Sequence, residues 1–186
     1  MTTLYFIYGT LIKVIVGLFL LRFLLQLTRA DFYNPVSLAV VKFTNPLVMP
    51  LRRIIPGLRG MDLASLGAAF LVQVAAFVLI DGWFFRGQLP GLLASSIGAI
   101  ISLLNVLLSL YFMLILLRVL MSWLNPDPRN PMVSVLYSLT EPVMAPARRL
   151  LPPIGGLDLS PIVVLFAISI LQVFLNSELV PWIARL

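Results

Sequence analysis

The chain has 186 residues, of which 61% are hydrophobic and only 11% are charged. Soluble domains carry about 25% charged residues, so this composition excludes an ordinary soluble protein and indicates a membrane protein. Neither Cys nor His occurs in the sequence, which excludes disulfides, thiolate nucleophiles, imidazole acid–base chemistry and the usual zinc and haem ligands. We therefore expect a protein that is not an enzyme and that binds no metal or other cofactor.

The net charge of +6 is explained by membrane topology. Eight of the 13 Lys and Arg residues fall within residues 28–62 and 124–158, which connect hydrophobic windows. Basic residues gather in this way in the cytoplasmic loops of membrane proteins. We therefore expect both connections to be cytoplasmic and both termini to lie on the opposite side, with no direct contact to nucleic acid.

The first predicted span covers residues 4–27. About 20 helical residues cross a hydrocarbon core of about 30 Å, and this window is long and apolar enough. Arg22 lies near its end, from where a long side chain can reach the lipid headgroups. The connection that follows contains Asn34-Pro35, an N-capping residue followed by proline at the first helical position.

The rest of the first connection predicts two short helical fragments. Residues 36–44 form an apolar run that is too short to span and that Asn45-Pro46 should stop. A second fragment begins at Pro46 and ends at Arg52-Arg53, where positive charge complements the negative end of a helix. We expect these proline-hinged fragments to lie in the membrane interface or to re-enter the membrane shallowly; an ordinary amphipathic surface loop is the alternative.

Asp62 ends this connection, directly before the second predicted span, residues 63–85. A carboxylate at such a place is typical of a helix N-cap, because it accepts hydrogen bonds from the free N–H groups of the first turn. An ion pair between Asp62 and Arg22, or catalytic work by the carboxylate, would be the alternatives. We expect capping.

The same pattern returns 96 residues later, without insertion or deletion. The pattern consists of ten identical pairs at this offset that are mostly Arg, Pro or Gly: Arg22 and Arg118, Asn34 and Asn130, Pro35 and Pro131, Pro46 and Pro142, Pro50 and Pro146, Arg52 and Arg148, Arg53 and Arg149, Pro56 and Pro152, Gly60 and Gly156, and Asp62 and Asp158. So many Arg, Pro and Gly identities at one offset indicate an internal duplication. We call residues 1–88 the first half and residues 89–186 the second half.

The offset also predicts the elements of the second half. The third span maps to residues 100–123, which leaves residues 89–99 as a short interfacial lead-in, and the fourth span covers residues 159–182. Because each half holds two spans, the halves run in the same direction. The predicted fold is an all-α membrane protein with four transmembrane helices, arranged as two parallel two-helix repeats with a proline-hinged connection in each.

The start of the fourth span carries a fuller capping signal than the second. Asp158 or Ser160 should accept from the free N–H groups, while Pro161 enters the first turn. Pairing of Asp158 with Arg118 is the alternative here.

The doubled pattern has Asn-Pro, then Pro-x-x-x-Pro-x-Arg-Arg, then Gly-x-Asp before an apolar helix. It resembles the YggT family of bacterial membrane proteins, including plastid YlmG-like relatives, over nearly the whole chain. One departure is that the first half has Asp62-Leu63-Ala64-Ser65 where the second has Asp158-Leu159-Ser160-Pro161. The resemblance implies a multi-pass protein of the bacterial inner membrane, so that the expected termini are periplasmic.

The resemblance also implies several roles without a shared chemistry. Bacterial members are associated with osmotic stress tolerance and potassium uptake, and plastid relatives with nucleoid distribution and haem attachment to a membrane cytochrome. A small scaffold or assembly factor that organises lipids or partners at the cytoplasmic face would account for them. The alternative is an oligomeric ion transporter or channel component, which needs polar groups along a path. The predicted spans offer Lys13, Gln26, Gln73, Ser102, Asn105, Ser109, Ser169, Gln172 and Asn176.

The candidate binding residues are the two adjacent arginine pairs, Arg52-Arg53 and Arg148-Arg149. Guanidinium groups bind phosphate or carboxylate oxygens in pairs, and a pseudo-two-fold axis would bring both pairs to one site, with Arg22 and Arg118 at its floor. The alternative is that they only orient the protein and touch headgroups. The expected partners are membrane lipids, anionic ones above all, and a membrane protein or a second copy of the chain.

Overall fold

The structure is a computed structural model that describes residues 2–31, 33–58, 60–79, 91–124, 127, 130–151 and 158–179. Its elements in order are α1 (Thr2–Leu27), α2 (Pro35–Arg52), α3 (Leu63–Ala75), α4 (Leu92–Leu124), α5 (Pro131–Leu150), α6 (Ser160–Phe174) and the π-helical turn η2 (Leu175–Leu179). Within these ranges the regular elements are all helical, which confirms the predicted all-α class for the described part of the chain.

Among the residues that the structure describes, three helices are long and apolar enough to cross a membrane, which agrees with a membrane protein. They are Thr3–Leu27, Leu92–Leu124 and Ser160–Leu179. A fourth apolar helix, Leu63–Leu79, is shorter within the described residues. The predicted second and fourth spans extend to residues 85 and 182, and their last parts, from residues 80 and 180 onward, lie outside the described ranges.

The predicted lead-in and third span belong to one helix, and the boundary between them stays a prediction. One continuous helix, α4, runs over 33 residues from Leu92 to Leu124 and so covers the predicted span at 100–123 and the part of the lead-in at 89–99 that the structure describes. The turns from Leu92 to Ala99 precede the predicted span. Those turns contain no proline and are apolar or small, so nothing in them ends the helix.

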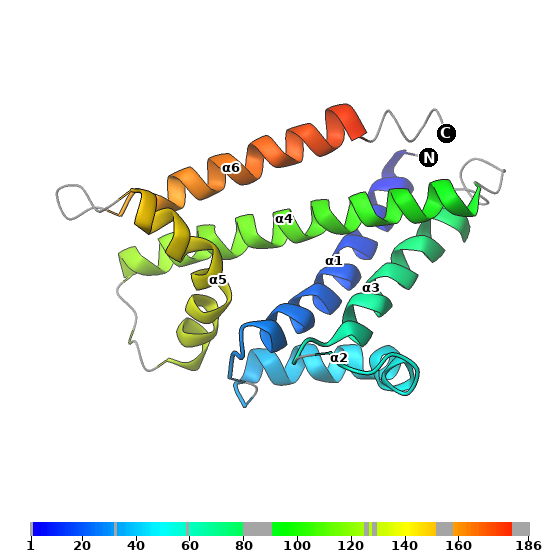
Figure 1. The fold of residues 1–186 in the computed structure, drawn as a ribbon, viewed down its shortest axis with the longest axis horizontal. Helices are drawn as coiled ribbons and strands as arrows, with labels where there is room; N and C mark the ends of the chain where they lie inside the picture. The colour runs from blue at the N-terminus through cyan, green and yellow to red at the C-terminus, as the bar shows by residue number, and fades with distance from the viewer. Residues whose placement is uncertain are drawn as a thin grey trace.

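The prediction of two separate fragments in each connection is also wrong. α2 and α5 are each one helix, with Pro46 and Pro50 inside α2 and Pro142 and Pro146 inside α5. All four prolines are exposed, so the carbonyl groups that lose a hydrogen-bond donor face outward, where they need no protein partner. Figure 1 shows that both helices change direction along their course, as proline makes a helix do.

Each half is built in the order apolar helix, amphipathic helix, apolar helix. α1 packs against α3, and α2 packs across both at one end. α4 crosses α1 and α3 and also packs against α6 and α5 (Figure 1). The two halves share a core where Leu103 and Val106 of α4 meet Val16 and Leu20 of α1.

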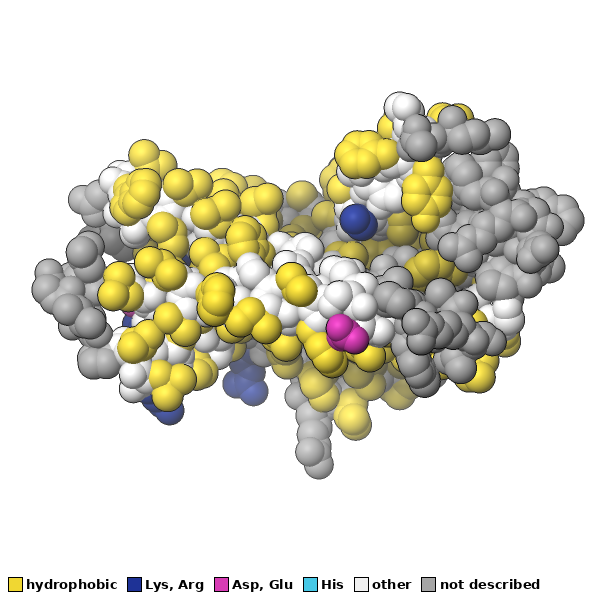
Figure 2. All heavy atoms as spheres, turned by 90° about the horizontal axis from the view of Figure 1, so that it is seen from above, with side chains coloured by type: hydrophobic (Ala, Val, Ile, Leu, Met, Phe, Trp, Pro, Cys, Tyr) yellow, Lys and Arg dark blue, Asp and Glu magenta, His cyan; other side chains and the backbone are white. Residues whose placement is uncertain are grey.

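The outer surface is largely apolar. Figure 2 shows hydrophobic side chains over most of the described surface on the side of α4 and α6, with few charged groups among them. Large side chains such as Phe6 on α1 and Phe166 on α6 are 73% and 68% exposed. A soluble monomer rarely exposes so much contiguous apolar surface, so this surface is suited to lipid chains.

Candidate functional site

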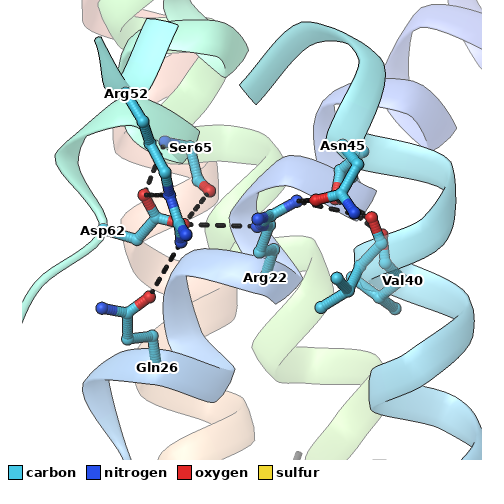
Figure 3. A network of polar contacts seen from close by, with 9 residues as sticks. Arg22, Gln26, Val40, Asn45, Arg52, Asp62 and Ser65 are labelled. Carbon is cyan, nitrogen blue, oxygen red and sulfur yellow. Dashed lines mark hydrogen bonds and ion pairs between the residues drawn. The ribbon is translucent and has the colours of Figure 1, made fainter. Parts of the chain in front are cut away.

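The first half is held together by Arg22, which α1 places in the interior. Its side chain is almost fully buried. Nε donates to Asp62 Oδ2 at 3.2 Å, and Nη1 donates to Thr44 Oγ1 at 2.7 Å and to Asn45 Oδ1 at 2.9 Å. Figure 3 shows these partners on both sides of the guanidinium, with Asp62 on one side and α2 on the other. One charged group thus joins three helices.

Asp62 performs two of the roles that the sequence left open. It caps α3, because its carboxylate accepts from the Ser65 N–H at 3.4 Å and from Ser65 Oγ at 2.6 Å. It also forms an ion pair with Arg22 and a second one with Arg52, whose Nη2 donates to Oδ2 at 2.7 Å and whose Nε donates to Oδ1 at 3.3 Å. Two guanidinium groups therefore converge on one buried carboxylate (Figure 3).

Thr44 is a site residue that the sequence analysis missed. Its hydroxyl donates to the Val40 carbonyl at 2.6 Å and accepts from Arg22, so it passes a hydrogen bond from the buried charge to the backbone of α2. In the second half, Thr140 Oγ1 donates to the Leu136 carbonyl at 2.7 Å and accepts from Arg118 Nη1 at 2.8 Å. The two threonines are identical at the same offset of 96 residues, which was the signal that could have found them.

The second half also pairs its buried arginine, Arg118, but with a carboxylate from a different position. Arg118 Nη2 donates to Glu141 Oε2 at 3.0 Å, and its guanidinium lies 4.2 Å from the centre of the Tyr137 ring. Glu141 stands where the first half has Asn45, and it also pairs with Arg148. Arg118 therefore forms its ion pair with Glu141 and not with Asp158; the described partner of Asp158 is Arg148, at 3.9 Å.

The residues expected to start helices lie at helix starts. Asn34 Oδ1 accepts from the Ser37 N–H at 2.9 Å with Pro35 as the next residue, and Asn130 Oδ1 accepts from the Met132 N–H at 3.0 Å with Pro131 following. At α6, Asp158 Oδ1 accepts from the Ser160 N–H at 2.9 Å, and Pro161 is in the first turn. The Ser160 hydroxyl itself is buried and has no hydrogen-bond partner among the described residues.

The two members of each adjacent arginine pair have different surroundings. Arg52 and Arg148 form the ion pairs above, whereas Arg53 and Arg149 are exposed and take part in no ion pair between described residues. The described ion pairs of each arginine stay within its own half. Figure 1 places the C-terminal ends of α2 and α5, which carry these arginines, on opposite sides of the molecule, so each half has a site of its own.

The carboxylates of Asp62, Glu141 and Asp158, whose ion pairs are described above, share one electrostatic feature, a pKa below the ordinary range. For Asp62, burial acts to raise the pKa, but hydrogen bonds from Arg52 and Ser65 and the charges of Arg52 and Arg22 together lower it. Although burial acts to raise the pKa of Glu141, Arg148 and Arg118 lower it. Again against the effect of burial, hydrogen bonds from Ser160 lower the pKa of Asp158. These carboxylates are thus anionic near neutral pH, as ion-pair partners must be.

Comparison with known proteins identifies the family. The family described as CCB3/YggT matches residues 1–83 and again residues 97–179. The chain belongs to the CCB3/YggT family. The two matched segments begin at the same separation of 96 residues as the repeated polar pattern. No solved structure matches.

Relatives cover most of the chain. It is 42% identical to an uncharacterised protein of Pseudomonas aeruginosa over 160 residues, which are 86% of this chain and 81% of that protein. It is 37% identical to the protein YggT of Escherichia coli K12 over 173 residues, 92% of this chain and 88% of YggT. The Arabidopsis thaliana chloroplast protein CCB3, which is named for cofactor assembly of complex C, is 34% identical over 84 residues, 45% of this chain and 46% of that protein.

We predict that the two buried arginines differ in their effect on stability. Arg22→Met leaves the buried Asp62 with one partner fewer, and breaking a buried ion pair costs about 3–5 kcal/mol. Arg118→Met leaves Glu141, whose side chain is 46% exposed and can hydrate, so the loss should be about 1–2 kcal/mol. Unfolding by SDS in mixed micelles, followed by circular dichroism, measures both. Equal losses would contradict this difference between the halves.

We also predict a loss of stability in acid. Because the pKa of Asp62 is lower in the folded state than its ordinary value of 3.8, its contribution is present above that value and disappears as the pH falls through the folded-state pKa. The thermal midpoint in micelles should therefore change little from pH 7 to about 5 and fall below about pH 4. Asp62→Asn should lower the midpoint at neutral pH and flatten the acid limb, and an unchanged acid limb in this variant would refute the assignment.

Proposed function

We propose that this protein is a non-enzymatic protein of the bacterial inner membrane, a small scaffold or an assembly or stress-tolerance factor. It organises lipids or partner proteins at the cytoplasmic face, and by family resemblance it is linked to osmotic stress. The observation that carries this proposal is the pair of amphipathic helices α2 and α5, each fastened to the apolar helices through a buried arginine.

The surface of α2 supports a role in contacts. One face is buried through Ser37, Val40, Thr44 and Val48. Apolar side chains also cover the exposed part: Leu38, Phe43, Leu47 and Met49. α5 likewise exposes Met132, Tyr137 and Leu150. An amphipathic helix with apolar groups on its free side lies in the membrane interface, where it can contact lipid or another membrane protein.

The relative from Arabidopsis supports an assembly role. Its name attributes to it the assembly of a cofactor in complex C. A protein that presents two firmly held interfacial helices is suited to positioning a partner while another component acts on it. We extend that role to this chain as assembly of a partner, a membrane protein or a second copy of the chain, with no cofactor of its own.

For the membrane arrangement we propose four spans in two parallel two-helix repeats. The described part of the second span, Leu63–Leu79, has 17 residues, about 26 Å of helix at 1.5 Å per residue. Continuation to residue 85 would bring it to the thickness of the hydrocarbon core. The connections 28–62 and 124–158 are then cytoplasmic and both termini periplasmic.

Within this arrangement the arginine pairs face the cytoplasmic leaflet. Arg52 and Arg148 are engaged by carboxylates, so contact with anionic headgroups falls mainly to Arg53 and Arg149, at about 1 kcal/mol for each basic residue near such a surface. Charge alone suffices for this role.

One observation favours the alternative, an oligomeric ion transporter for potassium. Between α4 and α6, Asn105 and Asn176 exchange amide hydrogen bonds of 3.3 and 3.4 Å, and Gln172 Nε2 donates to Ser109 Oγ at 2.9 Å. Ser109 and Asn176 are exposed, and polar side chains on a membrane-facing surface are typical of ion pathways or helix contacts.

The first experiment tests topology. Alkaline phosphatase fused after Leu186 should be active, because this enzyme works only in the periplasm, whereas a green fluorescent protein fusion at the same place should be dark. The Arg53→Lys, Arg149→Lys double variant should give the same result, since it keeps the charge. A fluorescent fusion after Leu186 in the wild-type protein would refute four spans with periplasmic ends.

The second experiment distinguishes scaffold from transporter. A photo-crosslinking residue replaces Phe43 on α2, which is 74% exposed, or Phe166 on α6, which is 68% exposed and serves as the matched control. The scaffold predicts protein adducts from position 43 that are absent at position 166. Purified protein in liposomes should then carry no potassium flux. Flux above that of protein-free liposomes, without adducts at position 43, would favour the transporter.

A further inference from the structure

A cavity of about 530 Å³ opens beside the C-terminal end of α1. Arg22 and Gln26, one helical turn apart on α1, line it together with Arg29 from the turn that follows this helix. Arg52 from α2 adds a third guanidinium group, and Gly60 from the turn after α2 also lines the cavity. Its walls therefore carry three guanidinium groups, from α1, from the turn after α1 and from α2.

The charges around this cavity do not cancel. Asp62 is the carboxylate that pairs with Arg22 and Arg52, and it neutralises one of the three positive charges. Arg29 takes part in no ion pair between described residues. Arg22 uses Nε and Nη1 for its described hydrogen bonds, which leaves Nη2 as a donor. Two excess positive charges thus border a space that is large enough for a ligand.

The backbone holds Arg29 in an unfavourable conformation at this place. Its φ is +52°, a left-handed value that is rare for residues other than Gly, Asn and Asp. The Ala30 N–H donates to the Leu25 carbonyl at 3.0 Å and the Arg29 N–H to the Gln26 carbonyl at 3.2 Å, which is the Schellman arrangement that usually has Gly at this position. An arginine at a position where glycine is preferred points to a function for its side chain.

The second half lacks the same surplus. At the corresponding positions it has Asn125 in place of Arg29 and Glu141 in place of Asn45. Glu141 pairs with both Arg118 and Arg148, and Arg148 also faces Asp158 at 3.9 Å. There the charges of two arginines are balanced by those of two carboxylates. In the first half, which has Asn45, arginine donors therefore remain available for a ligand. In the second half, Glu141 forms ion pairs with the arginines at the corresponding positions.

We propose that the cavity beside α1 binds one phosphate group. Arg29 binds its oxygens through its guanidinium edge, and Arg52 donates through Nη1, because its Nε and Nη2 donate to Asp62. Gln26 and Nη2 of Arg22 donate from the floor. Guanidinium groups form strong, paired hydrogen bonds with phosphate oxygens. The phosphate belongs to the headgroup of an anionic lipid or is a free phosphate; both present the same oxygens. This site does not depend on the proposed function, since a scaffold and a transporter could each use it.

The test uses the full chain, delipidated in an uncharged detergent, and three probes. These are dihexanoyl phosphatidylglycerol, inorganic phosphate and, as a lipid without net charge, dihexanoyl phosphatidylcholine, titrated by calorimetry. We expect one phosphatidylglycerol or phosphate to bind per chain and phosphatidylcholine to bind at least tenfold more weakly, because it lacks the net negative charge that the arginines attract.

Two variants remove the proposed chemistry while keeping the local structure. Arg29→Asn removes a donor, and Asn tolerates the left-handed conformation; Asn45→Glu places a carboxylate beside Arg22 as Glu141 does beside Arg118. Each should weaken binding about tenfold or more. Lys42→Asn is the matched control, because it removes one charge from an exposed position of α2 that does not line the cavity; it should stay within about twofold of the wild type by the same reasoning.

The lipid and inorganic phosphate titrations distinguish a lipid headgroup from free phosphate as the ligand. If the wild type binds phosphatidylglycerol but not inorganic phosphate, and both Arg29→Asn and Asn45→Glu lose this binding, the site holds a lipid headgroup. If inorganic phosphate also binds the wild type and both variants weaken its binding equally, the site holds free phosphate. The proposal is overturned if neither probe binds the wild type, if both variants bind as well as the wild type, or if Lys42→Asn loses as much as they do. Circular dichroism and gel filtration check folding, and either variant alone decides the matter if the other does not fold.

Discussion

The structure depends on a guanidinium group in an apolar interior. An unpaired charge there would cost several kcal/mol, so Arg22 must have partners wherever α1 is placed, and those partners come from two other helices. Asp62 fixes the start of α3, while Thr44 and Asn45 fix the position of α2 along α1. Apolar packing alone would let these helices slide; directional hydrogen bonds to one buried group do not. The amphipathic helix is thereby made a rigid part of the fold.

The two halves meet this constraint with the same framework and different charges. Arg118 and Thr140 repeat the geometry of Arg22 and Thr44 to within 0.1 Å in the hydrogen bond that joins them. The third partner changes from Asn45 to Glu141, one residue after the threonine in both halves. In the first half the balancing carboxylate comes from the start of α3; in the second, α5 carries its own, and Asp158 is more exposed. One framework thus supports two electrostatic environments.

Local signals in the sequence predicted local structure well. Asn34-Pro35 and Asp62 lie at helix starts because capping involves residues two or three positions apart. The proline stops were wrong because Pro46 and Pro142 lie on exposed faces, where losing one backbone hydrogen bond matters less than the packing of the buried face. Thr44 was overlooked because a threonine in an apolar run has no visible partner until α1 and α2 are placed together. That Arg118 pairs with Glu141 and not with Asp158 likewise depends on the distances between these side chains in the folded protein, which the sequence does not show.

The length of α4 has a consequence for the bilayer. Its 33 residues extend about 50 Å at 1.5 Å per residue, whereas a typical hydrocarbon core is about 30 Å thick. To bury all of it, the helix would have to tilt by roughly 50°, more than the 0–40° that spanning helices show. Its first turns, where Leu92 and Leu93 are both more than 70% exposed, must then thicken the surrounding lipid or leave it. Hydrophobic mismatch would make the protein sensitive to membrane thickness, and so to changes in bilayer tension.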